Sequence, residues 1–196
     1  VELAPILTDW KQKARARKIP FFSFTLLRDP VEFAVSFFSH FHVFGDARFG
    51  PNMEGTVENL KNHLQHNPQC LYLYKGEQAY FRRHKFYNVT RQDCQQVQTL
   101  LHQVMDWVGD TKNLSKDTLP LLTWWITGNA GLASQLESSN VAGKRQQKYQ
   151  PLSKRNVDED TRELIRSYSM LDEGLYQSAV ITEKLKEAAG IIQQKG

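Results

Sequence analysis

Apolar residues in this chain gather in short runs between polar segments with helical spacing, and the first such run covers residues 21–27 (FFSFTLL). The run is rich in aromatic residues and too short for an independent helix, which predicts a buried strand of a parallel sheet. The basic segment 8–18 before it predicts a helix that has Thr8 or Asp9 as its N-cap and is ended by Pro20. The first part of the chain is therefore expected to be a helix followed by a strand.

The residues after this strand carry the signals of a helix start. Asp29 is a good N-cap, and Pro30 suits the first helical position, where its missing N–H costs no hydrogen bond. The apolar segment 31–44 (VEFAVSFFSHFHVF) then predicts a helix that ends before Gly45. A strand, a short loop and a helix in this order make half of a βαβ unit.

The rest of the chain alternates helices and loops. Loops are expected at 45–55 and, as a long surface loop, at 134–160, whereas residues 71–74 indicate neither a helix nor a strand clearly. The other predicted elements are helices at 56–66 (ended by Pro68), 91–104, 119–126 (buried, capped by Gly128) and two between 158 and 194, with a second strand at 105–108 closed by Gly109. We therefore expect one α/β domain over residues 1–196, a parallel sheet flanked by helices.

Composition supports an ordinary globular domain. Hydrophobic residues make up 40% of the chain and charged residues 23%, which excludes disordered, collagen-like and coiled-coil classes. The formal net charge of +4 mildly favours anionic partners without selecting one. No apolar run approaches the roughly 20 residues that span a bilayer, so the chain is expected to be soluble, with a membrane link only through an upstream anchor.

The two cysteines, Cys70 and Cys94, exclude a disulfide-rich scaffold and a cysteine-based zinc cluster. They could pair in an oxidising compartment, or both could be free thiols. Two glycosylation sequons begin at Asn88 and Asn113. Together these features favour a secretory compartment.

One constellation suggests a binding site for phosphate. Arg28 stands at the carboxyl end of the predicted strand, where open α/β sheets bind ligands. The helix that follows offers free N–H groups to an anion, and Ser36 lies two turns into it. The guanidinium of Arg28 is a planar, permanently charged fork that suits phosphate. The alternative is that Arg28 pairs with Glu32, one turn on, while Ser36 only faces solvent.

The segment 25–38 (TLLRDPVEFAVSFF) resembles the 3′-phosphate-binding motif of sulfotransferases that use 3′-phosphoadenosine 5′-phosphosulfate (PAPS). In that motif a strand ends in Arg-Asp-Pro and a Ser follows eight residues after the Arg, positions held here by Arg28 and Ser36. The resemblance implies a parallel sheet related to the P-loop nucleotide kinases, in which these two residues bind the cofactor. The continuation through residue 51 is similar to the heparan and uronyl 2-O-sulfotransferases.

Two later segments extend the resemblance to carbohydrate sulfotransferases. Residues 105–122 are similar to a late strand, glycine and helix of that group, but Lys112 stands where the group has an acidic residue. Residues 151–179 resemble its closing pattern, with Asp172, Leu175 and Tyr176 in place. In related enzymes the loop at the start of this segment helps to cover the cofactor. The resemblance therefore makes candidate phosphate ligands of three residues, which could equally be solvated loop residues: Ser153, Lys154 and Arg155.

The resemblance implies a transferase that moves the sulfuryl group of PAPS to a glycan hydroxyl in the Golgi lumen, although a cytosolic location is not excluded. The family's first phosphate loop, and the histidine base of the 2-O group, have no counterpart before Phe21. We therefore expect the fold to lack its N-terminal part. A non-catalytic binding or assembly module is the alternative function, and the catalytic base is unassigned.

Basic residues elsewhere are candidates for contacts with an acidic acceptor. Basic and aromatic residues interleave near residues 80–87, a pattern that suits a glycan, single-stranded nucleic acid or merely an exposed loop. The proposed substrate-binding residues are Arg48, Arg82, Arg83 and Lys85. We expect a glycan partner rather than nucleic acid.

No metal site is expected from the histidines. His40 and His42 are two residues apart and point to different faces of their helix. His63 and His66 are predicted to share a helix face, but the sequence offers no third ligand near them.

Overall fold

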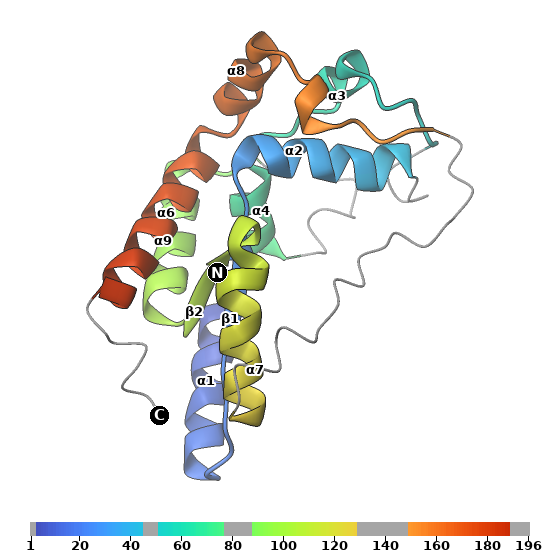
Figure 1. The fold of residues 1–196 in the computed structure, drawn as a ribbon. Helices are drawn as coiled ribbons and strands as arrows, with labels where there is room; N and C mark the ends of the chain where they lie inside the picture. Colours follow the sequence, from blue (N-terminus) through green and yellow to red (C-terminus); the bar gives the residue numbers. More distant parts are fainter. Residues whose placement is uncertain (1–2, 45–50, 77–87, 129–148, 189–196) are drawn as a thin grey trace.

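The computed structural model describes residues 3–44, 51–76, 88–128 and 149–188. Within these ranges the protein is a mixed α/β structure that is mostly helical, with a small parallel sheet (Figure 1). The expected α/β class is thus confirmed at this level. Most of the predicted loop at 134–160 lies outside the described residues.

The sheet consists, within the described residues, of two parallel strands, β1 (Phe24–Leu27) and β2 (Trp107–Asp110). Phe24 lies opposite Trp107 and Leu27 opposite Asp110, so both strands end at the same edge. The prediction that Gly109 closes the second strand is wrong, because Gly109 lies inside β2. A Cβ at this position would collide with Thr118 Oγ1 and would stand 2.9 Å from both Leu26 Cδ2 and Trp107 Nε1, so the strand needs a glycine here to pack.

The helices surround this sheet. Figure 1 shows α2 crossing above the strands, α6 and α9 together on one side, and α1 and α7 below. Their bounds are α1 Leu3–Ala16, α2 Pro30–Phe38, α3 Val57–Asn62, α4 Pro68–Lys75, α6 Arg91–Gln103, α7 Leu119–Thr127, α8 Glu159–Tyr168 and α9 Met170–Ala188. A π-helical turn extends α2 (Ser39–Val43), and another precedes α7 (Leu114–Thr118). Short 3₁₀ turns cover Thr111–Asn113 and Lys154–Asn156.

Local capping chemistry explains several of these helix starts. The carboxylate of Asp29 accepts a hydrogen bond from the backbone N–H of Glu32, and Pro30 occupies the first helical position, as the sequence predicted. Thr90 forms a capping box with Asp93 at the start of α6.

Two helix predictions were wrong at their ends. The first helix begins before Thr8, whose hydroxyl donates to the carbonyl of Ala4 from within the helix, so neither Thr8 nor Asp9 is its N-cap. Pro68 does not end the preceding helix but begins α4, because a proline without N–H fits a first helical turn.

The prediction that 119–126 is a buried helix was also wrong. Its C-cap Gly128 is as predicted, with a φ of 73°. However, Trp125 is 37% exposed and Ile126 is 72% exposed, and Thr123 is the buried residue of this helix. An apolar segment therefore forms a helix that is only partly buried.

Two hydrophobic clusters make the core. One lies among the strands, α4, α6 and α9, and includes Leu27, Val97 and Leu175. The other lies on the far side of α2, where Val35 and Phe38 pack against α3, α8 and the segment around Leu152. One cluster thus packs the end of β1 and the other packs α2, so the loop between them joins two buried elements.

A disulfide and an ion pair join elements that are far apart in the chain. Cys70 on α4 is bonded to Cys94 on α6, which answers the question that the sequence left open. Lys11 on α1 lies 2.9 Å from the carboxylate of Asp106 at the start of β2. Burial acts against ionisation of Asp106, but hydrogen bonds from Ser23 and Lys11 outweigh it and lower the pKa of the carboxyl. None of the helices in the described ranges has the length and apolar character needed to cross a bilayer.

Candidate functional site

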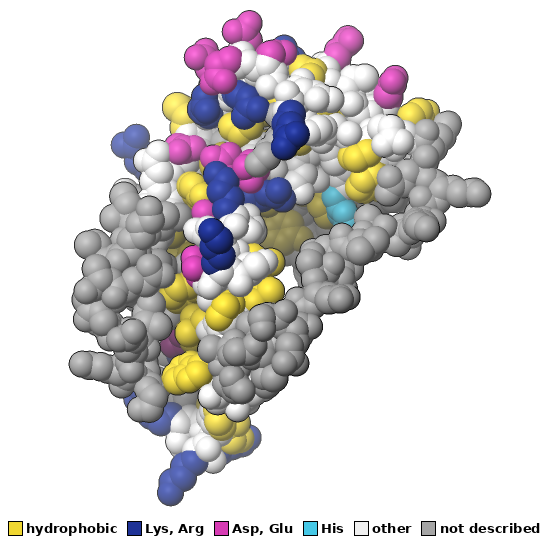
Figure 2. All heavy atoms as spheres, in the orientation of Figure 1, with side chains coloured by type: hydrophobic (Ala, Val, Ile, Leu, Met, Phe, Trp, Pro, Cys, Tyr) yellow, Lys and Arg dark blue, Asp and Glu magenta, His cyan; other side chains and the backbone are white. Residues whose placement is uncertain are grey.

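A cavity of about 410 Å³ lies where β1 ends, between the strand, α2 and α4. Figure 2 shows the molecule hollowed below α2, with hydrophobic side chains inside and Lys or Arg side chains at the edge. The polar residues of its wall come from several parts of the chain and include Thr25, Arg28, Ser36, His40, Gln69 and Thr111. This is the edge of the sheet where parallel α/β structures bind ligands.

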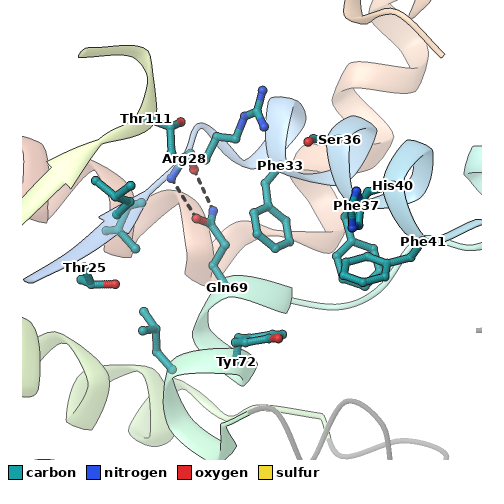
Figure 3. A pocket seen from close by; sticks show the side chains of 13 residues that line it. Thr25, Arg28, Phe33, Ser36, Phe37, His40, Phe41, Gln69, Tyr72 and Thr111 are labelled. Carbon is teal, nitrogen blue, oxygen red and sulfur yellow. Dashed lines mark hydrogen bonds between the residues drawn. The ribbon is translucent and has the colours of Figure 1, made fainter. Parts of the chain in front are cut away.

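Arg28 and Ser36 both line this cavity, so the structure brings together the two residues that the sequence motif singled out. In the close view of Figure 3 the guanidinium of Arg28 and the hydroxyl of Ser36 lie on the same side of the Phe33 ring. The side chain of Arg28 is 36% exposed. Its Nε is nevertheless buried and makes no hydrogen bond within the described residues.

The backbone of Arg28 is fixed by Gln69 at the start of α4. The N–H of Arg28 donates to Gln69 Oε1 at 2.9 Å, and Gln69 Nε2 donates to the carbonyl of Arg28 at 2.7 Å. Both bonds appear in Figure 3. The side-chain amide of Gln69 thus pairs with the backbone of Arg28 as a peptide group of a neighbouring strand would. This pairing fixes the position from which the Arg28 side chain extends.

Gln69 is in turn held by a buried carboxylate. Asp172 on α9 is 1% exposed, and it accepts hydrogen bonds from the N–H groups of Gln69 at 2.9 Å and Cys70 at 2.8 Å. Burial raises the pKa of Asp172 to about 7, although these two hydrogen bonds act in the opposite direction. Asn67 completes a reciprocal cap, because its side-chain oxygen accepts from the N–H of Leu171 on α9.

The end of β2 is fixed by the same helix. The hydroxyl of Tyr176 donates to Asp110 Oδ2 at 2.7 Å, while Asp110 Oδ1 accepts from the N–H of Lys112 at 2.9 Å. Burial and the contact with Asp110 raise the pKa of Tyr176, so its phenol stays protonated as the donor. Asp172 and Tyr176, both in the closing pattern of the sequence, therefore support the start of α4 and the end of β2.

Charged side chains cluster around Arg28, which lines the cavity. Arg28 Nε lies 3.7 Å from Glu32 Oε2, so the ion pair that the sequence offered as an alternative is present. Lys112 Nζ lies 3.9 Å from Glu32 Oε1 and 3.9 Å from Asp29 Oδ2. Glu32 in the first turn of α2 thus lies near two cations of the described residues, Arg28 and Lys112.

Aromatic rings form much of the cavity wall, and the sequence analysis did not single them out. Phe33, Phe37 and Phe41 come from the helix, and Tyr72 comes from α4. The spacing of the three phenylalanines by four residues could have indicated a shared helix face. A wall of rings beside a guanidinium suits a ligand with a flat apolar part and an anionic part.

Comparisons of this chain with protein-family models, curated proteins and solved structures gave no match. The assignment of function therefore depends on the geometry above and on the sequence motif.

The other predicted ligands do not meet at this cavity. Ser153 and Arg155 are exposed, and the hydroxyl of Ser153 accepts from the N–H of Arg155. They follow Leu152, which packs against the face of α2 turned away from the cavity. Lys154 lies in the same turn, and nothing is described of its side chain. The predicted substrate ligands Arg48, Arg82, Arg83 and Lys85 lie outside the described residues.

The histidines divide between the cavity and the core. His40 lines the cavity, whereas His42 is 6% exposed, so the two do point to different sides. The rings of His42 and His63 lie 4.8 Å apart, and burial together with His63 lowers the pKa of His42 to about 4. His63 and His66 follow the end of α3, so the prediction that they share a helix face is wrong. The described residues contain no group of three or more potential metal ligands.

Proposed function

We propose that this protein binds PAPS at the cavity and transfers its sulfuryl group to a hydroxyl of a glycan. The observation that carries the proposal is that Arg28 and Ser36, the two residues of the 3′-phosphate motif, line one cavity at the carboxyl end of β1. A P-loop nucleotide-kinase-like sulfotransferase fold is part of the same proposal. The parallel pairing of β1 and β2 supports it.

Different residues of the cavity would bind different parts of the cofactor. Arg28 and Ser36 bind the 3′-phosphate, the guanidinium by charge and the hydroxyl by a hydrogen bond. The aromatic wall formed by Phe33, Phe37 and Tyr72 suits the adenine ring. Cofactor binding of this kind fixes the position of the sulfuryl group, which matters because in-line group transfer depends on positioning.

In the transfer step a new S–O bond forms to the acceptor oxygen while the S–O bond to the 5′-phosphate breaks. The acceptor hydroxyl gives its proton to a base, and 3′-phosphoadenosine 5′-phosphate (PAP) leaves with the bridging oxygen. His40 lines the cavity and is the histidine nearest in sequence to Ser36.

Two features support a location in the Golgi lumen. The disulfide between Cys70 and Cys94 belongs to an oxidising compartment. The acceptor asparagines of both sequons, Asn88 and Asn113, are exposed, as glycosylation requires.

Calorimetry with PAP tests the binding step. The protein is expected to bind PAP, and Arg28→Ala is expected to weaken binding about tenfold or more, since a hydrogen bond between charged groups contributes about 1.5–3 kcal/mol. Ser36→Ala should weaken binding less. Arg15→Ala removes an exposed arginine of α1 and serves as the control. Equal affinities for the Arg28→Ala and Arg15→Ala proteins would refute the proposed site.

Transfer is tested separately, with labelled PAPS and a uronic-acid glycan as acceptor. Label in the glycan that depends on Arg28 supports the enzyme. PAP binding without transfer supports instead the non-catalytic module that the sequence left as an alternative.

A further inference from the structure

Glu32 lies near two cations: Arg28, which lines the cavity, and Lys112, which follows the lining residue Thr111. Its carboxylate is 3.7 Å from Arg28 and 3.9 Å from Lys112, each measured from nitrogen to oxygen. The side chain of Glu32 is only 13% exposed, whereas those of Arg28 and Lys112 are 36% and 45% exposed. A largely buried carboxylate thus holds two cations that solvent can still reach.

Both contacts are charge pairs rather than close hydrogen bonds, because their separations exceed the usual limit of about 3.2 Å for N–H···O. At these separations the attraction of each cation to Glu32 lacks the added strength of a charge-assisted hydrogen bond. Arg28 also has a buried Nε that makes no hydrogen bond within the described residues. An incoming phosphate could therefore improve on the geometry that Glu32 provides.

We propose that Lys112 is a second cation for the 3′-phosphate and that Glu32 is an internal anion that holds Arg28 and Lys112 when the cavity is empty. This inference rests on the proposed function, since it concerns the same phosphate. When the phosphate enters, both cations turn from Glu32 to its oxygens. Lys112 stands where the sulfotransferases that the chain resembles have an acidic residue, so this contact is a feature of the present chain.

The arrangement of the carboxylates supports these roles. Glu32 lies near both Arg28 and Lys112, whereas Asp29 is paired with Lys112 alone of these two. The carboxylate of Asp29 already accepts a hydrogen bond as the N-cap of α2. Glu32 is therefore the carboxylate that a phosphate replaces as the partner of the two cations. A dianionic phosphate competes with Glu32 better than a singly charged anion does, so Glu32 makes the site selective for phosphate monoesters.

The test is calorimetry at one salt concentration with two ligands, PAP and adenosine 5′-phosphate, which lacks the 3′-phosphate. Lys112→Gln is expected to weaken PAP binding about tenfold, and Glu32→Gln is expected to strengthen it by a similar factor. Both substitutions should leave the affinity for adenosine 5′-phosphate within about twofold of the original. Lys112→Arg keeps the charge and should retain most of the affinity.

Matched controls come from nearby exposed residues. Lys116→Gln removes a lysine four residues along the chain, and Glu58→Gln removes a glutamate from the first turn of another helix. Neither should change the affinity for PAP. Melting curves of all variants verify that they fold.

The outcomes separate this inference from the proposed function. If PAP does not bind, or if Arg28→Ala binds it normally, the function and the inference both fail. If Arg28→Ala loses binding but Lys112→Gln behaves like Lys116→Gln, the function stands and Lys112 is not a phosphate ligand. If Glu32→Gln binds PAP no more tightly than the Glu58→Gln control, Glu32 does not compete with the ligand.

Discussion

The carboxylate of Asp172 offers the sharpest test of how the candidate site is held. It is 1% exposed and accepts two hydrogen bonds, from the backbone N–H groups of Gln69 and Cys70. The substitution Asp172→Ala removes both acceptors from the first turn of α4 and gives these donors no replacement. Each unsatisfied buried donor costs about 1–3 kcal/mol, so the expected loss in the free energy of unfolding is about 2–6 kcal/mol.

The cost of this substitution should depend on pH in a defined direction. Burial raises the pKa of Asp172 from 3.8 to about 7 in the folded protein. Its protonation therefore contributes stability that is fully present below about pH 3.8 and is lost as the pH rises through 7. A shift of this size corresponds to about 4 kcal/mol. The destabilisation by Asp172→Ala should thus be largest near pH 4 and become smaller towards pH 8.

Urea denaturation followed by circular dichroism at several pH values measures both effects. Asp160→Ala is the control, because Asp160 is an exposed carboxylate in the first turn of α8. Asp172→Ala should also weaken PAP binding, because Gln69 fixes the backbone of Arg28. A loss below 1 kcal/mol at every pH, or the same pH dependence in both variants, would show that Asp172 does not cap α4 in the way described.

Three further predictions concern stability. Replacing both Cys70 and Cys94 by Ala should lower the free energy of unfolding by about 3.5 kcal/mol, the loop-closure value for a separation of 24 residues, and adding reductant to the unsubstituted protein should give the same change. Gly109→Ala should destabilise the protein by about 1–3 kcal/mol, because its Cβ would crowd Thr118 and Leu26. Gly174→Ala has open space inside a helix and should stabilise the protein by about 0.5–1 kcal/mol, and similar effects at the two sites would contradict this packing. The pKa of His42 is about 4 in the folded protein, below its usual 6.5, so His42 contributes stability that is present above pH 6.5 and is lost as the pH falls through 4. His42→Leu should therefore remove about 3 kcal/mol of the acid-induced loss of stability measured in urea titrations. An unchanged loss would exclude this role for His42.

The sequence predicted well those features that depend on neighbouring residues. Asp29 and Pro30 start α2 because an N-cap and a fixed φ act within one helical turn, so these residues can be recognised in the sequence. The capped C-terminus at Gly128 follows from the same kind of local rule. The strand of residues 21–27 was predicted correctly in type but too long, since β1 starts at Phe24. Element ends depend on tertiary contacts that the sequence does not display.

The sequence could not predict the side chains that reach the site from distant parts of the chain. Gln69 is 41 residues from Arg28, and Asp172 is 103 residues from Gln69. A glutamine and an aspartate carry no local signal that they will cap a strand end or a helix. Lys112 was noticed only as a departure from a family pattern, and its approach to Glu32 depends on the parallel pairing of β1 with β2.

The same helix holds both strand ends at the cavity, and this explains why the closing segment matters for a site that it does not line. Asp172 and Tyr176 are four residues apart on α9 and so lie on one helix face. Asp172 acts on Arg28 through α4 and Gln69, whereas Tyr176 acts on the β2 end through Asp110. Side chains of one helix thus reach the supports of both strand ends, although this helix contributes no described residue to the cavity wall.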